Sequence, residues 1–411
     1  MLAILTTHPI QYQVPLWQML ARDGRVPFEV WYLTGRGASV RHDHEFGKSF
    51  AWDLDMLSGY TYRFLDVVPG ATPTTHWKCR LRESLAHRLK VSGTKALWIQ
   101  GWLVAGYWQA AWQAKRTGVE VWLRAESNDL APLPPLKRLA KRVILGQFFQ
   151  RVDRFLYIGT ANRRLYQKYG VSEDRLSPAP YAVDNDRFVL QAESIRSQRS
   201  EIRRRWSIPD HTFCVLFCGK FIPKKRPFDL VKAAQLLLAS HSELRIHLLF
   251  AGSGELGGEL RAACHVVCDA EASQRSEVRG QRSAPDNREL ITDNAKPRAS
   301  FTGFLNQTEI SQAYVAADVL VLPSDYGETW GLVVNEAMAS GLICLVSDHC
   351  GCAEDLGVIT PNEVFHCGDY PALADALARQ ARNESPMRTK QPPSLAETLE
   401  TVSRLTSDWR K

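Results

Sequence analysis

Residues 319–347 have the sequence VLVLPSDYGETWGLVVNEAMASGLICLVS, in which two short apolar runs enclose a helix-like segment. The first run, VLVLP, predicts a buried parallel strand, and residues 330–340 predict a helix that ends at the following glycine. Glu328 then lies in the strand-to-helix loop, and Glu336 lies on the second turn of the helix. Free N–H groups at a helix start suit a phosphate or a sugar hydroxyl, and two nearby carboxylates suit a polyol. The stretch therefore predicts a nucleotide-sugar site.

This stretch resembles the Glu-x7-Glu motif of the family-4 retaining glycosyltransferases, which have the GT-B fold. In that family the first Glu and the backbone after it hold the donor sugar, and the second Glu holds the ribose of the nucleotide. The resemblance gives the sugar to Glu328 and the ribose to Glu336. It adds donor contacts from the intervening segment, at Trp330, Gly331, Leu332 and Val333. An ordinary amphipathic helix with two solvated Glu side chains is the alternative interpretation.

The composition is that of a soluble globular protein, with 45% hydrophobic and 23% charged residues in 411 positions. A net charge of +7 is a mild excess that does not indicate nucleic-acid binding. Because no run of about 18 apolar residues occurs and the start lacks a signal-peptide pattern, we expect a cytoplasmic protein. The family resemblance suggests an anionic membrane surface or a phosphate-bearing substrate as the partner of this positive charge. A membrane partner would place the protein peripherally at the inner face of the membrane.

The nine cysteines are scattered and odd in number, which predicts reduced thiols. Cys264, His265 and Cys268 leave a metal site open as an alternative, although no second half with matching spacing follows. We expect no metal and no cofactor, with a nucleoside-diphosphate sugar as the donor substrate.

Strand-like and helix-like runs alternate along the chain, which favours an α/β fold with doubly wound parallel sheets. Strands are predicted at 2–7, 28–33, 62–67, 96–101, 119–126, 154–160, 213–219, 245–252, 319–323 and 342–347. Helices are predicted at 77–91, 104–117, 136–149, 227–240, 308–316 and 330–340.

These runs predict two Rossmann-like domains, an acceptor-binding one over 1–190 and a nucleotide-sugar-binding one over 212–393. The polar, Arg-rich residues 191–211 are predicted to be a linker. Residues 269–299 almost lack apolar periodicity and are predicted to be a mobile insertion. The resemblance implies that the domains face each other across a cleft, as in GT-B enzymes. It also implies that a last helix, within 394–411, returns to the N-terminal domain.

A second motif, FCGKFIPKKRPFDL at 217–230, places lysines directly after a predicted strand that ends at Gly219. Ammonium groups at this place can offset the negative charge on a departing nucleotide. The family has Arg directly after the Gly and Lys five positions later, whereas this chain has Lys220 and Lys225. The positive charge is kept but the bidentate fork is lost. A basic surface loop is the alternative interpretation.

A rival fingerprint, FAGSGELG at 250–257, has the dinucleotide-binding spacing of Gly252, Gly254 and Gly257 after a strand. It leaves an NAD-dependent oxidoreductase as an alternative. However, the motif follows the second predicted strand of its domain, and many family-4 enzymes carry Gly-x-Gly there against the nucleotide. By the same resemblance, Gly303 in SFTGFLNQTEI contacts the base.

Acceptor contacts are expected in the N-terminal domain, in the loop that follows the first strand. In many relatives a His ends the strand that here has the sequence VEVWLRAESN, 119–128, and Glu126 takes that place. Candidate acceptor contacts are His8, Gln11, Tyr12, Arg124 and Glu126.

Residues 136–154, LKRLAKRVILGQFFQRVDR, interleave basic and apolar side chains. A basic amphipathic helix of this kind can lie on an anionic leaflet. A core-packed helix with a solvated basic face is the alternative.

Together these features predict a metal-independent retaining glycosyltransferase that moves a hexose-type sugar from a nucleoside-diphosphate sugar to a hydroxyl. Its acceptor would be a glycan or lipid-linked, in glycan, polysaccharide or glycolipid biosynthesis. The catalytic candidates are Lys220, Lys225 and Glu328. A non-hydrolysing sugar-nucleotide epimerase of the same fold and a binding-only relative remain alternatives.

Overall fold

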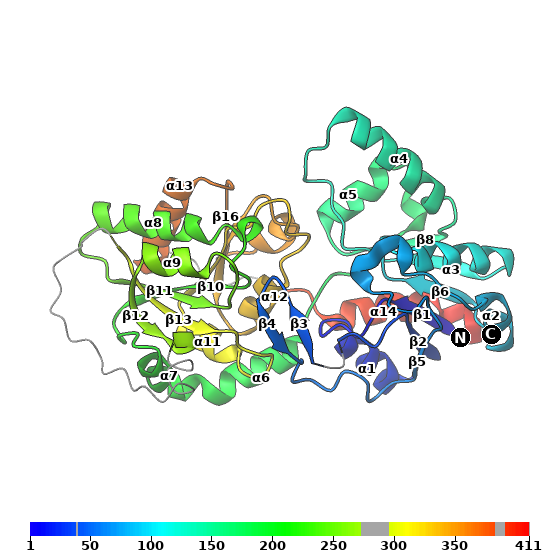
Figure 1. The fold of residues 1–411 in the computed structure, drawn as a ribbon, viewed down its shortest axis with the longest axis horizontal. Helices are drawn as coiled ribbons and strands as arrows, with labels where there is room; N and C mark the ends of the chain where they lie inside the picture. The colour runs from blue at the N-terminus through cyan, green and yellow to red at the C-terminus, as the bar shows by residue number, and fades with distance from the viewer. Residues whose placement is uncertain (38–39, 273–295, 383–390, 411) are drawn as a thin grey trace. The chain divides into compact units, whose positions relative to one another are not determined.

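The structure, a computed structural model, describes residues 1–37, 40–272, 296–382 and 391–410. It contains two compact units (Figure 1). Unit 1 comprises Met1–Arg41, Phe50–Asp184 and Pro393–Lys411, and unit 2 comprises His42–Ser49 and Asn185–Pro392. Most of the insertion predicted at 269–299 lies outside the described residues. None of the helices in the described ranges is long and apolar enough to cross a membrane.

Unit 1 is built on a seven-stranded parallel sheet of order β5-β2-β1-β6-β7-β8-β9. Its strands are β1 (Leu2–Thr6), β2 (Phe28–Tyr32), β5 (Tyr62–Phe64), β6 (Ala96–Ile99), β7 (Glu120–Leu123), β8 (Arg154–Tyr157) and β9 (Leu176–Pro178). Its main helices are α1 (Val14–Asp23), α2 (Leu85–Val91), α3 (Ala105–Arg116), α4 (Pro135–Phe149), α5 (Thr160–Lys168) and α14 (Leu395–Leu405). Short helical turns are η1 (Pro73–Lys78), η2 (Glu173–Arg175) and η6 (Ser407–Arg410). The sheet confirms the predicted parallel, doubly wound arrangement.

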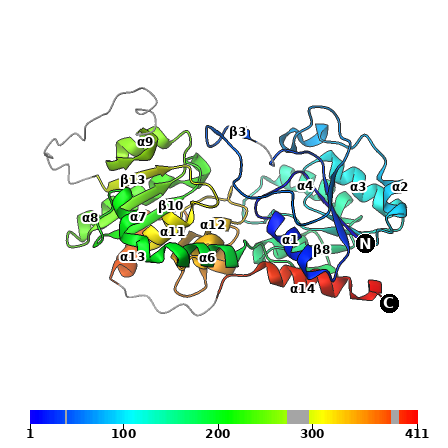
Figure 2. The ribbon, with the colours of Figure 1, turned by 90° about the horizontal axis from the view of Figure 1, so that it is seen from below.

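Both faces of this sheet are covered, as the continuous apolar runs of its strands require. On one face, the helices α2, α3, α4 and α5 contribute to a core that includes Leu89, Ala110 and Phe148. On the other face, α1 and α14 lie side by side (Figure 2). There Leu399 and Val402 of α14 share a core with Trp17 and Trp98, whose rings meet edge to face at 5.5 Å.

Unit 2 has a second seven-stranded parallel sheet, of order β12-β13-β11-β10-β14-β15-β16. Its strands are β10 (Phe213–Cys218), β11 (Ile246–Ala251), β12 (His265–Asp269), β13 (Arg298–Gly303), β14 (Val319–Leu322), β15 (Ile343–Ser347) and β16 (Glu363–Phe365). Its main helices are α6 (Asn185–Ile195), α7 (Arg199–Arg205), α8 (Pro227–Ser240), α9 (Gly257–Ala263), α11 (Ser311–Ala316), α12 (Leu332–Ala339) and α13 (Tyr370–Ala381). Short turns are η3 (Arg196–Gln198), η4 (Pro223–Lys225) and η5 (Ala353–Gly357). Because the strands are parallel, the loops that follow β10, β11, β13, β14 and β15 emerge at the same edge of the sheet.

The predicted linker at 191–211 is wrong, because most of this segment is helical and belongs to unit 2. The segment is Arg-rich, and two of its arginines bind other parts of unit 2 directly. Arg203 donates to the Ala316 carbonyl oxygen at 2.8 Å and to Asp318 at 2.7 Å, and Arg199 pairs with Asp318 at 2.5 Å. The guanidinium groups satisfy carbonyl groups at the end of α11. The stretch of unit 1 that precedes this segment ends at Asp184, whereas the N-terminal domain is predicted to extend to residue 190.

A two-stranded ribbon of β3 (Arg41–Asp43) and β4 (Lys48–Phe50) was not predicted from the sequence. Residues 42–49, called the 42–49 ribbon below, lie in the chain between β2 and β5 of unit 1. They nevertheless pack as part of unit 2.

Candidate functional site

Four glycines, in the loops after β10 and β11 and at the end of β13, meet at the carboxyl-terminal edge of the unit 2 sheet. The N–H of Gly252 donates to the Gly303 carbonyl oxygen at 2.9 Å. A Cβ on Gly252 would lie 2.0 Å from the carbonyl oxygen of Gly219, and one on Gly254 would lie 2.6 Å from that of Phe221. These backbones approach so closely that side chains are excluded. The structure thus brings together four of the five glycines predicted to bind the donor, and the fifth, Gly331, precedes α12.

Asp269 and Glu271, the acidic residues that follow the Gly252-Gly254-Gly257 motif, are bound by an arginine side chain. Arg261 donates to Asp269 at 2.6 Å and to Glu271 at 3.0 Å. In a dinucleotide-binding fold an acidic residue at this distance takes the ribose hydroxyls. Because both carboxylates here are held by Arg261, the oxidoreductase alternative is not favoured.

Lys225 and Glu328 form an ion pair that is largely shielded from solvent. Lys225 ends η4, after β10, and Glu328 lies in the loop between β14 and α12. The Glu328 N–H donates to the Asp325 carbonyl oxygen at 2.9 Å, and its own carbonyl accepts from the Gly351 N–H at 3.1 Å. Burial alone would lower the pKa of Lys225, but the Glu328 carboxylate outweighs it and raises that pKa. Lys225 is therefore a charged ammonium held at a fixed place.

The start of α12 is packed against the sheet through Gly331. This residue has φ +108, and a Cβ there would lie 2.7 Å from Leu322 Cδ2. Trp330 is only 2% exposed, and its indole N–H donates to Asn335 Oδ1 at 3.0 Å. The indole therefore supports the loop from inside the unit. Leu332 and Val333 follow as half-buried residues in the first turn of α12.

Glu336 is 3% exposed and lies on the second turn of α12, as its spacing from Glu328 predicts. The Tyr314 hydroxyl of α11 donates to Glu336 Oε2 at 2.5 Å. Cys218 Sγ, at the end of β10, lies 3.9 Å from the same hydroxyl. Tyr314 fixes the orientation of the carboxylate, and no sequence motif pointed to it.

Lys220 does not contact the Lys225–Glu328 pair but is held by the 42–49 ribbon. Its ammonium nitrogen lies 3.2 Å from Asp43 Oδ2 and 2.6 Å from Glu45 Oε2. Burial alone would raise the pKa of Asp43, but the Phe46 backbone N–H and the Lys220 charge together lower it. The hydrogen bond from Lys220 likewise lowers the pKa of Glu45. Both carboxylates are therefore ionised at neutral pH.

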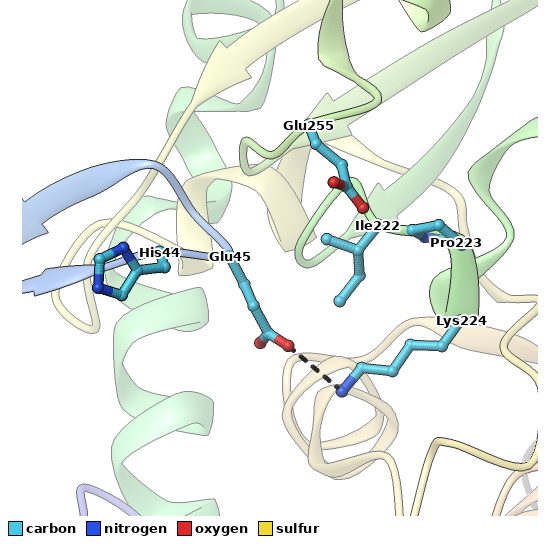
Figure 3. A pocket seen from close by; sticks show the side chains of 6 residues that line it. All are labelled: His44, Glu45, Ile222, Pro223, Lys224 and Glu255. Atoms are coloured by element: carbon cyan, nitrogen blue, oxygen red, sulfur yellow. Dashed lines mark ion pairs between the residues drawn. The ribbon is translucent and has the colours of Figure 1, made fainter. Parts of the chain in front are cut away.

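A pocket of about 400 Å³ lies beside this contact in unit 2 (Figure 3). Figure 3 shows Glu45 reaching toward Lys224, whose ammonium lies 3.8 Å from Glu45 Oε1. None of its lining residues is a candidate from the sequence, because they come from segments far apart in the chain: His44, Glu45, Ile222, Pro223, Lys224 and Glu255.

Unit 1 has a smaller pocket, of about 180 Å³, beside the ends of β1, β6 and β7. Among the acceptor candidates only Glu126 lines it, and the Tyr181 hydroxyl donates to Glu126 Oε1 at 2.6 Å. Polar side chains not predicted from the sequence complete much of the lining: Thr6, Thr7, Gln13, Gln100 and Tyr107.

The remaining acceptor candidates lie outside this pocket lining. Arg124 is buried, and its guanidinium donates to the carbonyl oxygens of Ala179 at 3.2 Å and Pro180 at 3.1 Å. It supports the backbone next to Tyr181 and does not face the pocket. The other three candidates lie in the loop between β1 and α1: His8, Gln11 and Tyr12.

All nine cysteines lie in described residues and are free thiols. Within the described ranges, no three His, Cys, Asp or Glu side chains are grouped so as to hold a metal ion. The cluster of Cys264, His265 and Cys268 considered from the sequence does not form one.

Comparison with known proteins gives matches to glycosyltransferases. Residues 198–392 match the family described as glycosyl transferases group 1. A D-inositol 3-phosphate glycosyltransferase of Thermomonospora curvata is 30% identical over 180 residues, which are 44% of this chain and 37% of that protein. The chain therefore spans well under half the length of this relative.

Two solved structures are similar over nearly the whole chain. The UDP-forming α,α-trehalose-phosphate synthase of Burkholderia vietnamiensis has a TM-score of 0.62 at 14% identity, covering 100% of this chain and 99% of that structure. HepE of Anabaena, solved with UDP-glucose, has a TM-score of 0.58 at 12% identity, covering 100% and 94%. At these identities the similarity concerns the fold, and it confirms the predicted GT-B class.

Proposed function

We propose that this chain, whose residues 198–392 match the family described as glycosyl transferases group 1, is a retaining glycosyltransferase. It would move a hexose-type sugar from a nucleoside-diphosphate sugar to a hydroxyl of a glycan or lipid-linked acceptor. The observation that carries this proposal is the Lys225–Glu328 pair, which lies beside the start of α12 and in the same unit as the buried Glu336. The UDP-glucose bound by HepE supports a nucleotide-sugar donor in a fold of this kind.

In this proposal each charged residue acts on a different part of the donor. Negative charge builds on the diphosphate as the nucleotide leaves, and the ammonium groups of Lys220 and Lys225 offset it. Glu328 accepts hydrogen bonds from hydroxyls of the donor sugar. Glu336, oriented by Tyr314, accepts hydrogen bonds from the ribose. Because the lysines supply the positive charge at the diphosphate, we propose that transfer needs neither a metal nor a cofactor.

On the acceptor side, we assign the pocket lined by Glu126 to the acceptor hydroxyl. Glu126 stands where many family members have a His, and its carboxylate is oriented by the Tyr181 hydroxyl. The lining also includes hydroxyl and amide side chains, and a carboxylate beside them can accept a hydrogen bond from a sugar hydroxyl.

We also propose that α4 binds an anionic membrane surface, at the inner face of the membrane. The helix ends at Phe149, as the predicted helix at 136–149 does, and the rest of the basic segment 136–154 lies outside it, with Arg154 in β8. Only its last turn is buried, through Leu145, Phe148 and Phe149. The preceding turns expose four apolar side chains, at 79, 60, 59 and 51% for Leu136, Leu139, Val143 and Ile144. Exposed basic residues lie among them, including Lys137, Arg138 and Arg142. Figure 1 shows α4 at the outer edge of unit 1, with α5 beside it.

The proposed reaction is tested by screening UDP- and GDP-sugars for thermal stabilisation and then measuring transfer with the donor that binds. Lys225→Ala is expected to lower turnover roughly 100-fold or more, as loss of one preorganised donor to the leaving charge typically does. Glu328→Gln should also impair transfer, whereas Glu336→Gln should act mainly on donor affinity because ribose contacts change little during the reaction.

The controls separate the alternatives. EDTA should leave transfer unchanged, and complete loss of activity with EDTA would contradict the metal-independent reaction. Full activity of a Lys225→Ala and Glu328→Gln double variant would mean that the active site lies elsewhere. Isomerisation of the donor without any acceptor would instead identify an epimerase.

A further inference from the structure

The 42–49 ribbon contacts three of the loops predicted to bind the donor in unit 2. Through Asp43 and Glu45 it binds Lys220, in the loop after β10. Through the Phe46 carbonyl oxygen it accepts a hydrogen bond from Ser253 Oγ at 2.8 Å, in the glycine loop after β11. Through the Phe46 ring it packs edge to face on Phe304 at 5.2 Å, directly after Gly303 and β13.

The charged side chains of the ribbon lie next to side chains of opposite charge in the donor site. Two carboxylates share one ammonium, since both Asp43 and Glu45 lie within hydrogen-bond distance of Lys220. Glu45 also lies near Lys224, and Lys220 lies 4.9 Å from the centre of the Phe46 ring. On the far side of the ribbon, Lys48 pairs with Glu271, whose side chain lies against Gly303. The ribbon is therefore complementary to the rest of unit 2 in charge as well as in shape.

These contacts have the chemical pattern of a nucleoside diphosphate. Two neighbouring anions bind the lysine that was assigned to the diphosphate. An aromatic ring lies next to the segment that was assigned to the base. A diphosphate on Lys220 would meet the Asp43 and Glu45 carboxylates at close range, and like charges there repel. The ribbon and the donor cannot occupy Lys220 together.

We propose that the 42–49 ribbon is an internal ligand of the donor site that imitates a nucleoside diphosphate and must leave Lys220 before the nucleotide sugar binds. This inference rests on the proposed function, because it takes the loops after β10, β11 and β13 as the donor site. The protein then has a bound-ribbon state that excludes the donor and a released-ribbon state that accepts it. The apparent dissociation constant of the donor is the intrinsic one divided by the released fraction. If one molecule in ten has released its ribbon, the donor binds about tenfold more weakly than the site allows.

The test is calorimetric titration of the full chain with UDP, GDP and inorganic pyrophosphate. The Asp43→Asn and Glu45→Gln double variant keeps the shape of the ribbon but removes its charges. It is expected to bind the preferred nucleotide about tenfold more tightly than the wild type. Phe46→Ala, which removes the aromatic contact, raises the released fraction and is expected to tighten nucleotide and pyrophosphate binding by the same factor, because both probes bind only the released-ribbon state.

Two controls bracket this result. Asp66→Asn combined with Glu173→Gln removes two exposed carboxylates from unit 1 and should leave the dissociation constants unchanged. Lys220→Met should weaken binding whether or not the ribbon carries its charges.

The outcomes distinguish the two proposals. Equal or weaker nucleotide binding by both ribbon variants, with wild-type melting temperatures, would overturn the ribbon inference while leaving the transferase assignment intact. If a ribbon variant melts early, the other variant decides. Absence of binding by all three probes in every variant would overturn the donor site itself, and the ribbon inference with it.

Discussion

Gly252 is the residue at which the donor-site loops of unit 2 leave the least space. Its φ of +138 is a conformation that side-chain-bearing residues rarely adopt, and a Cβ would meet the Gly219 carbonyl at 2.0 Å. Both the φ angle and the close contact involve backbone atoms, which cannot move aside as a flexible side chain can. The resemblance to family-4 enzymes implies that the backbone at this position approaches a nucleotide. The structure adds that the close approach is first of all to another loop of the same unit.

Gly252→Ala is therefore expected to destabilise unit 2 by about 1–3 kcal/mol or more and to weaken nucleotide binding. Thermal melting and nucleotide titration measure the two effects. Gly258→Ala is the matched control, because a Cβ there has no heavy atom within 4 Å and the residue lies in α9. Equal melting temperatures for the two variants would contradict the packing argument.

His247 is a buried residue of β11 whose titration opposes folding. Its Nε2 lies 2.8 Å from Ser300 Oγ, and that hydroxyl donates to the Trp206 carbonyl oxygen at 2.6 Å. The imidazole N–H is therefore on Nε2. Burial, together with the nearby charges of Arg298 and Arg203, lowers the pKa of His247 to about 4.

Because this pKa is below the unfolded value near 6.5, the unfolded chain takes up the proton first as pH falls. The stability from neutral His247 is fully present above about pH 6.5 and is lost progressively between about pH 6.5 and 4. Lowering the pH from 7 to 5 should cost unit 2 about 2 kcal/mol from this residue alone.

His247→Gln keeps a donor to Ser300 and cannot be protonated, so its free energy of unfolding should change less over the same pH interval. Urea unfolding at both pH values measures the difference. His87→Gln, at an exposed position of α2, should keep the wild-type pH dependence. An unchanged pH dependence in His247→Gln would show that His247 is not responsible for it.

At the scale of elements, the sequence predicted those segments whose apolar period is strong. The buried runs of β10, β11, β14 and β15 and the helix α8 lie where the sequence placed them, to within a residue or two. The sequence failed where tertiary contacts decide the structure. The arginines of α7 add no apolar periodicity to the sequence. Their partners are carbonyl groups at the end of α11, and for Arg203 this partner lies 113 residues away in the chain.

In the candidate site, too, the sequence indicates the residues that belong to local motifs and misses those that tertiary contacts bring in. The Lys225–Glu328 pair and the buried Glu336 follow from motifs with local spacing, so the sequence could indicate them. Tyr314 and the 42–49 ribbon reach the site from other elements, and their short polar stretches resemble ordinary loops. The resemblance predicts a donor contact at Trp330, and Arg124 is an acceptor candidate because it flanks Glu126. In the structure the Trp330 indole donates to the Asn335 side chain, and the Arg124 guanidinium donates to backbone carbonyl oxygens.

The element with the clearest surface prediction is α4. Replacing Leu139 and Val143 with Ser removes two exposed apolar side chains, each worth about 2 kcal/mol when buried in an apolar medium. Flotation with vesicles of phosphatidylcholine and phosphatidylglycerol should therefore weaken by roughly 100-fold or more. Wild-type binding should also fall as salt rises, because the basic residues are screened.

Leu190→Ser is the matched control, since this leucine of α6 is equally exposed but lies in unit 2. It should leave flotation unchanged. Wild-type binding to pure phosphatidylcholine vesicles as strong as to anionic ones would contradict a role for the basic residues of α4.

At the scale of the whole molecule, the division of the chain does not follow its order. Unit 1 is assembled from three stretches, and its last stretch, 393–411, comes after all of unit 2. This stretch is part of the core, because Leu395, Leu399 and Val402 pack with α1 and the sheet, and the Trp409 ring lies 5.8 Å from that of Trp122. Unit 1 therefore depends on a distant segment for one face of its sheet.

Leu399→Ala should accordingly destabilise unit 1 by about 2–3 kcal/mol and leave unit 2 nearly unchanged. Hydrogen exchange followed by mass spectrometry assigns the effect, since peptides of β1, β6 and α1 should lose protection while those of β10 and β14 keep it. Leu190→Ala, at an exposed position of unit 2, should change neither. Equal loss of protection in both units would mean that they unfold as one.

The placement of α14 also has a consequence for biosynthesis. The ribosome completes the first two stretches of unit 1, then about 200 residues of unit 2, and only afterwards the helix that covers Trp17 and Trp98. At roughly 5–20 residues per second, that apolar face stays open on the nascent chain for on the order of 10–40 seconds. Unit 2 can finish folding in this interval, whereas unit 1 cannot. The nascent chain should therefore be a client for chaperones that bind exposed apolar surface, and its need for them should end when 393–411 emerges.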